Sequence, residues 1–408
     1  MGVYVERVWI PSADGTASRR ARRGGRYRAF IPDALGRVPV VLDSATVAAI
    51  SDAERRIALL NARQPRSGRL AALGKFLLRA EAIGSSWIEG LKVNSSRLAR
   101  AEAMRALGRP PADGIATEIV GNAYAMRMAV EQVAARAAIR LDDILDVHRA
   151  LLAQSDFAHL GGVVRTAQNW IGGDGYNPLS AAFVPPPPEE VPALLQDLVG
   201  YMNENAASPL VQAALVHAQF EAIHPFADGN GRVGRALIHV VLRRRGLATA
   251  YVPPISVVLA ARPDAYRAGL NAFAYDGPPN MAAAEAVRDW IDEFTAAAGQ
   301  AAVAAEALAT RIDEIVAGWR MRASPVRANS AADLLLEVLP GEPVLSAGEA
   351  ATLIDRSPAA TNAAIDRLTE VGVLAPITQH RWGRVFEARD VLDALTWFEN
   401  AAAAISPG

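Results

Sequence analysis

The sequence predicts a mainly α-helical protein that ends in a winged helix-turn-helix domain. Apolar residues recur every three or four positions from Asp43 to about Leu107. Helical segments resume after a break at 109–114 and continue to about Arg322, with a loop at 275–280. The remainder, 323–408, reads as three short helices with a serine at each expected N-cap, then a two-stranded hairpin after Gly372. Helix, helix, helix, hairpin is the layout of a winged helix.

The composition of the 408 residues limits the classes of function. Lys and Arg together number 42 and Asp and Glu 43, so the chain is not coated in positive charge for nucleic acid, although a local basic patch stays open. There is no cysteine, which excludes disulfides, thiolate metal sites and cysteine nucleophiles. No signal peptide and no apolar run of membrane-spanning length is found, so we expect a cytoplasmic protein without a membrane partner.

The N-terminal region, 1–45, is irregular and holds two strand-like pieces, "VYVERVWI" and "VPVVL". Between them lies the basic run "RRARRGGRYR", 19–28, which reads as a solvated arm or as an arm that contacts phosphates. A second stretch rich in glycine and proline, 160–188, has short strand-like pieces and too many breakers for a helix.

The stretch "EAIHPFADGNGRVGRALIHVVLRRRG", 221–246, contains the spacing G-x-G-x-x-G. A dinucleotide fingerprint must follow a strand and have an acid about 20 residues further on. Here the preceding "PLVQAALVHAQFEAI" has helical spacing, and no acid lies between Asp228 and Asp264. The P-loop pattern is absent as well, so both readings are rejected.

The same stretch has the parts of a phosphoryl or nucleotidyl transfer site. Pro225 removes a backbone donor and forces His224 out of helical dihedrals, so the first helix ends there. A glycine-rich loop that leads into a helix N-terminus binds anions through backbone N–H groups. Asp228 is a carboxylate suited to Mg²⁺, and His224 is a base near neutral pH. Three glycines and two arginines complete this expected anion-binding loop: Gly229, Gly231, Gly234, Arg232 and Arg235.

"HPFADGNGRVGR", 224–235, closely resembles the signature of Fic-domain enzymes, and the resemblance extends over roughly 40–300. It implies an all-helical core with one β-hairpin flap, formed by "GGVVRTAQNWIGG…AAFVPPPP". It also implies AMPylation, in which AMP moves from ATP to a protein hydroxyl and pyrophosphate leaves. The branch of the family that transfers phosphate carries Lys at the position of Gly231, which disfavours that activity here.

The resemblance assigns roles by position. His224 would be the general base, Asp228 would hold Mg²⁺, and Phe226 would pack under the loop. Asn230 and the amides of Gly229 and Gly231 would form the anion hole. Arg232 and Arg235 would hold the β- and γ-phosphates. A target segment would pair by its backbone with the flap at Phe183 to Pro187, with Phe183, Val184 and Pro185 as the docking residues.

"SSWIEG", 85–90, resembles the autoinhibitory motif S/T-x-x-x-E-G/N of one large Fic group, with Ser85, Glu89 and Gly90 at the matching positions. A Glu89 carboxylate facing Arg235 would compete with the γ-phosphate for the same guanidinium. The resemblance therefore implies low basal activity that Glu89→Gly releases. Removal of AMP by Glu89 and His224 is the alternative reaction.

We expect three domains: an N-terminal helical region with the inhibitory motif (1–110), a Fic core (111–322) and the winged helix (323–408). The substrates would be ATP with Mg²⁺ and a target protein, the chain itself included, and a homodimer is left open. A regulator that binds DNA through the winged helix is a different reading. Its expected recognition helix has Arg367 beside Asp366 and Glu370. The hairpin offers His380, Arg381 and Arg384. This surface therefore carries few positive charges for binding DNA phosphates.

Overall fold

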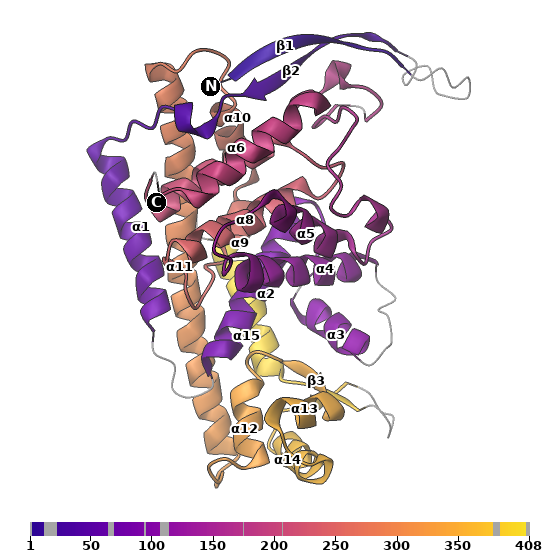
Figure 1. Cartoon of the computed structure of the whole chain (residues 1–408). Helices are drawn as coiled ribbons and strands as arrows, with labels where there is room; N and C mark the ends of the chain where they lie inside the picture. The colour runs from indigo at the N-terminus through magenta and orange to yellow at the C-terminus, as the bar shows by residue number, and fades with distance from the viewer. Residues whose placement is uncertain are drawn as a thin grey trace. The chain divides into compact units, whose positions relative to one another are not determined.

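The computed structural model is dominated by helices (Figure 1), and it describes residues 2–11, 23–63, 69–93, 95–106, 114–173, 175–205, 207–377 and 384–404. The chain divides into two compact units. Unit 1 is built from 1–51, 128–245 and 264–296, and unit 2 from 52–127, 246–263 and 297–408. Unit 2 thus draws on all three of the expected domains. In the described part of the chain, no helix combines the length and the apolar character needed to cross a membrane.

Unit 1 combines an N-terminal β-hairpin with a group of helices. Strands β1 (Gly2–Trp9) and β2 (Gly25–Pro32) pair antiparallel, with Glu6 opposite Arg28. The helical elements of the unit are η1 (Leu35–Arg37), the π-helical η2 (Ala129–Val133), α5 (Leu141–Leu152), η3 (Ala158–Leu160), η4 (Pro178–Ser180), η5 (Pro188–Glu190), α6 (Val191–Asn203), α7 (Pro209–Ile223), α8 (Asn230–Arg244), α10 (Pro263–Phe273) and the start of α11 (Met281–Arg322).

Helix α7 is the central helix of unit 1, and it contacts α6, α8 and β2. Every one of its residues except Pro209 and Glu221 is buried. A helix that is apolar on all sides is stable only when neighbours surround it. Ser208 caps its N-terminus by accepting a hydrogen bond from the Val211 amide at 3.5 Å. Because α7 is fixed on all sides, the residue at its C-terminal end has a defined position.

The flap segment, residues 161–188, forms a minimal hairpin at a single antiparallel bridge between Ile171 and Phe183. The Ile171 amide donates to the Phe183 carbonyl at 2.8 Å, and the Phe183 amide donates back to Ile171 at 3.2 Å. Three more prolines follow Val184 and Pro185. Because proline has no backbone N–H to donate, the antiparallel pairing cannot extend further along that strand.

Unit 2 contains most of α1 (Ser44–Ala62), then α2 (Arg69–Ile88), α3 (Ser95–Ala106), α4 (Gly114–Met128), α9 (Ile255–Ala261) and the C-terminal part of α11. Helices α2 and α9 pack very closely at Gly84, where an added Cβ would lie 2.5 Å from the Val257 nitrogen. Next to this contact, the buried Glu81 carboxylate accepts the Ser256 amide at 2.8 Å and the Ser256 hydroxyl at 2.5 Å. These bonds hold the second half of α2 in place.

The C-terminal part of unit 2 consists of α12 (Ala331–Val338), β3 (Val344–Ser346), α13 (Ala347–Ile354), α14 (Pro358–Glu370), β4 (Ala375–Pro376), β5 (Val385–Glu387) and α15 (Arg389–Ala404). Its three strands form an antiparallel sheet in the order β3-β5-β4. It has no separate core, because Leu335 and Phe386 belong to the same buried cluster as Phe76 of α2 and Trp319 of α11.

The helical expectation is confirmed, and so is each serine N-cap of the C-terminal part: Ser330, Ser346 and Ser357 accept hydrogen bonds from amides three residues on. Strand β3 was not expected, since three residues give no period to read. At the N-terminus, "VYVERVWI" overlaps β1, whereas "VPVVL" is wrong as a strand and has no regular structure. The strand that pairs with β1 is β2, which begins inside the basic run at 19–28. Residues 12–22 of that region lie outside the described residues.

Candidate active site

The site begins where α7 ends, at His224. This residue has φ 49° and ψ 60°, the left-handed region that side chains with a Cβ rarely adopt, and its amide still donates to the Phe220 carbonyl at 2.9 Å. A strained, non-glycine conformation is retained only where the surroundings enforce it, and it is common at functional sites. The side chain keeps 20% of its surface exposed, and Nδ1 lies 3.8 Å from Oε2 of Glu221.

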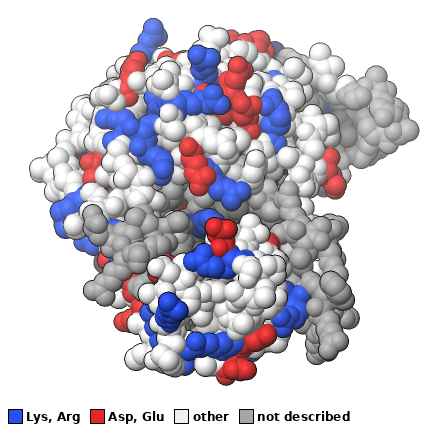
Figure 2. Space-filling view, turned by 60° about the horizontal axis from the view of Figure 1, so that its bottom comes forward, with Lys and Arg blue, Asp and Glu red and all other residues white. Residues whose placement is uncertain are grey.

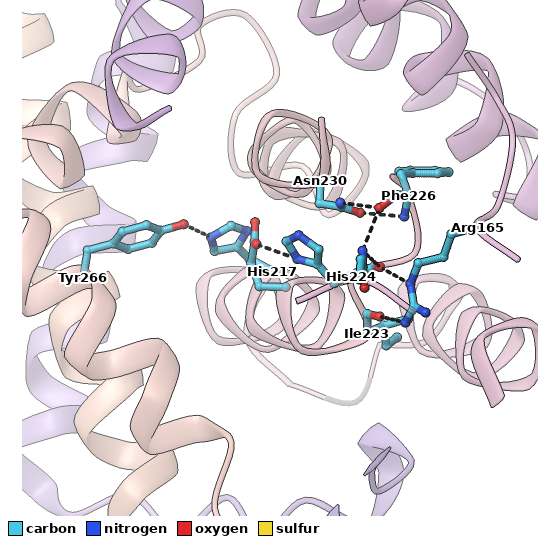
Figure 3. Close-up of polar contacts among 9 residues, drawn as sticks. Arg165, His217, Ile223, His224, Phe226, Asn230 and Tyr266 are labelled. Carbon is cyan, nitrogen blue, oxygen red and sulfur yellow. Dashed lines mark hydrogen bonds and ion pairs between the residues drawn. The ribbon is translucent and has the colours of Figure 1, made fainter. Parts of the chain in front are cut away.

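Two side chains of the flap segment hold the turn at His224 (Figure 3). Arg165 is buried, and its Nε donates to the His224 carbonyl at 2.8 Å while one terminal nitrogen donates to the Pro186 carbonyl at 2.6 Å. The Asn169 side-chain amide donates to the carbonyls of His224 and Phe226 at 3.3 and 3.0 Å. Burial lowers the pKa of Arg165 to about 10, so it stays charged at neutral pH and makes strong bonds to these carbonyls.

The Phe226 ring anchors the loop from below, as the sequence predicts. It is fully buried and stacks on the imidazole of His148, with ring centroids 3.7 Å apart and an interplanar angle of 11°. The His148 Nδ1 accepts the Gly162 amide at 3.0 Å, which leaves the proton on Nε2 to be donated to the Asp228 carbonyl, also at 3.0 Å. Burial lowers the pKa of His148 to about 4, so the ring is neutral and holds the loop as a fixed tautomer.

The loop passes into α8 through Gly229, whose φ of 80° places it in the left-handed region. An added Cβ there would lie 2.9 Å from a methyl carbon of Leu151, so both the dihedral and the space require glycine. Among the described residues, no carbonyl accepts the backbone N–H groups of Gly229, Asn230 or Gly231. These amides start a helix, where the first N–H groups have no intrahelical partner, so they remain available to bind an anion.

The Asn230 side chain has a different use from the expected one. It is buried, and both of its polar atoms bond the backbone of Phe226, at 2.8 Å each (Figure 3). The side chain therefore closes the loop on itself, and both of its polar atoms are used in doing so.

The charged residues of the site lie along the start of α8. Asp228 keeps 47% of its side chain exposed, and its Oδ2 lies 3.2 Å from a terminal nitrogen of Arg232. The side chains of Arg232 and Arg235 are buried, and they place two positive charges in the first two turns of α8. Gly234 lets α7 approach, since an added Cβ would lie 2.9 Å from Oε1 of Glu221 and 3.2 Å from Nδ1 of His217.

His217 is a packing and hydrogen-bonding residue. It lies fully buried between helices, and its Nε2 is 2.8 Å from the Tyr266 hydroxyl (Figure 3). Burial and then the positive charge of Arg235 lower the pKa of His217 to about 3. In the part of the chain that is described, no three His, Asp or Glu side chains converge as metal ligands. Asp228 alone fits a Mg²⁺ ion that takes its other ligands from phosphate oxygens and water.

The residues of the inhibitory motif lie in unit 2, at the end of α2. Ser85 is buried, and the Asn122 side chain of α4 bonds the neighbouring Ser86 hydroxyl at 3.0 Å and the Ala82 carbonyl at 2.9 Å. Glu89 is exposed on the turn that follows. Gly90 has φ 82°, and its amide donates to the Trp87 carbonyl, so it ends the helix as a left-handed glycine cap. This explains why the motif ends in Gly or Asn.

The flap residues named by the sequence lie beside the turn, but they are closed off. Val184 and Pro185 are buried, and the carbonyls of Val184 and Pro185 accept bonds from the Phe30 amide and the Gln168 side chain. Docking of a target segment along this strand, as expected, would have to displace bonds that the chain makes with itself.

Sequence reasoning missed the residues that hold the turn. His148, Arg165, Asn169 and Glu221 are distant in sequence from the signature or lie outside its letters, and none carries a local pattern. The one available signal was that Arg165 and Asn169 are polar residues in a glycine-rich stretch that had already been assigned to the flap.

Comparisons with known proteins agree with this arrangement. Residues 138–242 match the model of the Fic/DOC family, and residues 47–131 match that of the Fic/DOC family N-terminal region. Two curated relatives are called protein adenylyltransferases. The one from Caenorhabditis briggsae is 34% identical over 131 residues (31% of this chain, 23% of the relative), and the one from Drosophila willistoni is 30% identical over 210 residues (49% and 40%). The matched region thus spans less than half the length of these relatives.

Solved structures show the same fold. A Fic family protein from Desulfovibrio desulfuricans superposes with a TM-score of 0.51 at 21% identity, covering 86% of this chain and 97% of that one. Fic-1 from Caenorhabditis elegans gives a TM-score of 0.50 at 21% identity, covering 65% of this chain and 72% of that one. The family models cover residues 47–131 and 138–242, the second of which includes the loop at 224–235, and the fold agrees with them: these two regions of the chain are similar to the Fic/DOC family.

Proposed function

We propose that this chain is a protein adenylyltransferase, which moves AMP from ATP to a Ser, Thr or Tyr hydroxyl of a target protein. The observation that carries the proposal is that the His224 imidazole, partly exposed and held in a left-handed turn, belongs to the same short loop as the amides of Gly229 to Gly231, which no carbonyl of the described residues accepts. A base next to an anion site fits an acyl or phosphoryl-type transfer in which a hydroxyl must lose its proton.

In this reaction the hydroxyl oxygen forms a bond to the α-phosphorus while the bond between that phosphorus and the bridging oxygen to the β-phosphate breaks. The hydroxyl proton passes to His224, and pyrophosphate leaves. The backbone amides at the start of α8 bind phosphate oxygens, and the partial positive charge of the helix N-terminus favours them. Arg232 and Arg235 supply the charge that the leaving pyrophosphate needs.

Mg²⁺ would enter with ATP and would neutralise phosphate charge. Asp228 is the residue that would hold it, since its carboxylate is exposed and sits directly before the helix N-terminus. The names of the curated relatives support adenylyl transfer, although the matched region is only part of each relative.

We also propose that Glu89 inhibits the activity. Glu89 is exposed on the turn at the end of α2, and a carboxylate that pairs with Arg235 competes with the γ-phosphate for that guanidinium. Glu89 belongs to unit 2 and Arg235 to unit 1. The inhibition is therefore tested by measuring transfer activity. The same carboxylate could instead orient a water that removes AMP, which is the second reaction to be measured.

The test uses the full chain as wild type, Glu89→Gly and Glu89→Gly/His224→Ala, each with Mg²⁺ and ATP labelled in the α- or the γ-position. Transfer of α-label to protein by Glu89→Gly, and its loss in the double variant, is the expected result. Transfer of γ-label would identify a kinase. If no variant transfers label while the wild type releases AMP from a modified protein, removal of AMP is the main reaction.

DNA binding by the C-terminal part is not proposed, because nothing described there favours it. The Arg367 side chain bonds the Ala323 and Pro325 carbonyls, and Arg384 bonds Asp366 and Asn362. The exposed face of α14 offers alanines with Asp366 and Glu370. Figure 2 shows Lys and Arg interspersed with Asp and Glu on the face where these helices lie. His380 and Arg381 lie outside the described residues.

A further inference from the structure

A cavity of about 500 Å³ lies within unit 2, and no residue of the loop at 224–235 lines it. Its walls come from α2, α3 and α4, from the turn before β3, from β3 itself and from α13. Proteins bind small molecules in cavities of about 300–1,000 Å³ that are mostly apolar and carry a few polar groups. Six charged residues and one tyrosine line this cavity together with five apolar side chains: Leu78, Ala103, Val120, Ala123 and Val344.

The three carboxylates of the lining are already bonded by the chain. Glu102 accepts a hydrogen bond from the guanidinium of the buried Arg79 at 2.6 Å. Glu342 accepts from Lys75 at 2.8 Å, and its other oxygen lies 3.7 Å from Arg79. The third carboxylate, Glu349, accepts a backbone amide at 2.8 Å in the first turn of α13, where the partial positive charge of the helix N-terminus compensates it. The cavity therefore does not favour a cationic ligand.

Arg127 and Tyr124 line the same cavity and are in the opposite situation. They are three residues apart on α4, so they lie on one face of the helix, and the Arg127 guanidinium is 5.5 Å from the centre of the Tyr124 ring. Arg127 is exposed, and Tyr124 is 49% exposed. Within the described ranges, no carboxylate pairs with Arg127, and the Tyr124 hydroxyl makes no hydrogen bond. The lining thus retains one cation that the chain does not neutralise.

We propose that this cavity is a binding site for a small organic anion, namely a carboxylate or a phosphate monoester with a flat or apolar body. Arg127 donates to the anionic head, because a planar guanidinium bonds two oxygens of a carboxylate or a phosphate at once. Lys75 has two N–H groups besides the one that it gives to Glu342, and these donate to the same head. The site shares no residue with the transfer reaction, so it does not depend on the proposed function.

The apolar part of the lining selects the body of the ligand. The Tyr124 ring is half exposed, and Leu78, Val120 and Val344 are buried around the cavity. A flat or apolar body that covers these side chains removes apolar surface from water, which a bare phosphate or acetate ion cannot do. Head and body therefore both contribute, and a molecule that lacks either one binds more weakly.

The test measures binding of phenyl phosphate and of benzoate to the full chain by isothermal titration calorimetry. Inorganic phosphate and acetate are the heads without a ring, benzyl alcohol is the ring without a charge, and benzylamine carries the opposite charge. Arg127→Gln removes the cation, and Ala123→Trp fills the cavity. Arg311→Gln is the matched control, because Arg311 also lies in unit 2, 5.2 Å from the centre of the exposed Trp397 ring, and does not line the cavity. Thermal unfolding verifies that each variant folds.

We expect phenyl phosphate or benzoate to bind with a Kd of about 1 mM, and the tighter of the two identifies the head as a phosphate ester or a carboxylate. The bare heads, benzyl alcohol and benzylamine should bind at least about tenfold more weakly. Arg127→Gln and Ala123→Trp should each weaken the tighter anion at least about tenfold, and Arg311→Gln less than about twofold. Unchanged binding in Arg127→Gln, or an equal loss in Arg311→Gln, would overturn the inference. No heat of binding from either ring anion at about 10 mM, or tighter binding of benzylamine, would overturn it as well.

Amide hydrogen exchange locates the bound anion, which matters because the amides at the start of α8 also attract anions. With the tighter ring anion present, exchange should slow in α4, 114–128, of the wild type and should not change there in Arg127→Gln. Slower exchange at 224–235 with none in α4 would place the anion at the start of α8, and the cavity would then not be its site.

Discussion

The side-chain amide of Asn230 bonds both backbone polar groups of Phe226: Oδ1 accepts its N–H at 2.8 Å, and Nδ2 donates to its carbonyl at 2.8 Å. The same Phe226 carbonyl also accepts from Asn169 at 3.0 Å. The first residue of α8 thus pins the residue that follows the proline of the turn. This closure fixes the position in space of the residues between His224 and the amides of 229–231.

Replacing Asn230 tests this closure. Asn230→Asp keeps an acceptor for the Phe226 amide but loses the donor to its carbonyl, and Asn230→Ala loses both. A buried polar group left without its partner costs about 1–3 kcal/mol, so we expect Ala to lower the free energy of unfolding by that amount. Chemical denaturation measures it. If Asn230→Ala loses transfer activity with its stability unchanged, the side chain contacts substrate instead.

His224→Ala should abolish transfer with little change of fold. General bases contribute about 10²- to 10⁴-fold to the rate, so a loss of that order in kcat is expected in the Glu89→Gly background. Because alanine is also strained at φ 49°, His224→Gly is the better variant for stability, and it should be at least as stable as the parent. A single-turnover assay with α-labelled ATP gives the rate. Retention of more than about a tenth of the rate would count against the role of base.

Two glycine-to-alanine changes form a matched pair. Gly229→Ala meets Leu151 at 2.9 Å and is strained at φ 80°, so a loss of stability of about 1–3 kcal/mol and of activity is expected. Gly200 lies at an exposed position of α6, and an added Cβ would have no atom within 4 Å. Gly200→Ala should therefore raise the free energy of unfolding by about 0.5–1 kcal/mol. Thermal unfolding of both variants measures the difference. Equal effects of the two changes would contradict the steric account of Gly229.

Arg165→Lys tests the link between the turn and the flap. Lysine keeps the charge but cannot reach the carbonyls of His224 and Pro186 together, since it lacks the planar fork. We expect kcat for transfer to fall about 10- to 100-fold with the KM for ATP changed by less than about threefold, because the amides of α8 are untouched. Arg7→Lys, at the exposed ion pair with Glu189, serves as control. A larger effect on the KM for ATP than on kcat would show that Arg165 acts on the nucleotide site.

The stability of the fold should depend on pH through His148. Its pKa is lowered to about 4 in the folded protein, because burial disfavours the charged ring. Protonation of Nδ1 would also place its N–H against the Gly162 N–H, which now donates to that nitrogen. The unfolded chain binds the proton more readily, so this contribution is complete above pH 6.5 and is lost as the pH falls toward 4. Between pH 7.5 and 5 the loss is about 2 kcal/mol.

Urea unfolding of wild type and His148→Gln at several pH values measures this contribution. The variant should be less stable at pH 7.5 and should lose less stability on acidification than the wild type. His217, whose pKa is lowered to about 3, contributes with the same sign in both proteins and cancels in the comparison. Parallel pH profiles would show that His148 does not titrate in this window.

The sequence by itself determined the features that depend only on residues close together in the chain. Proline after His224 ends α7, glycine at 229 permits a left-handed turn, and serines at 330, 346 and 357 cap the helices that follow them. Each of these depends on one or two neighbouring residues, and the helical class follows from the period of the apolar residues. The conformation of the loop at 224–235 could therefore be predicted, while the roles of its amides and of His224 stay predictions.

Only the tertiary structure decided which residues hold that loop and which backbone groups of the flap are already bonded. Arg165 bonds His224 across 59 residues and His148 bonds Asp228 across 80, and Phe30 bonds Val184, which no spacing in the sequence reveals. Backbone groups have no sequence signature, so the flap strand with the named residues looked available until Phe30 was seen to bond Val184. Long-range packing sets these contacts, because it depends on the shapes of whole helices and strands rather than on the order of residues along one of them.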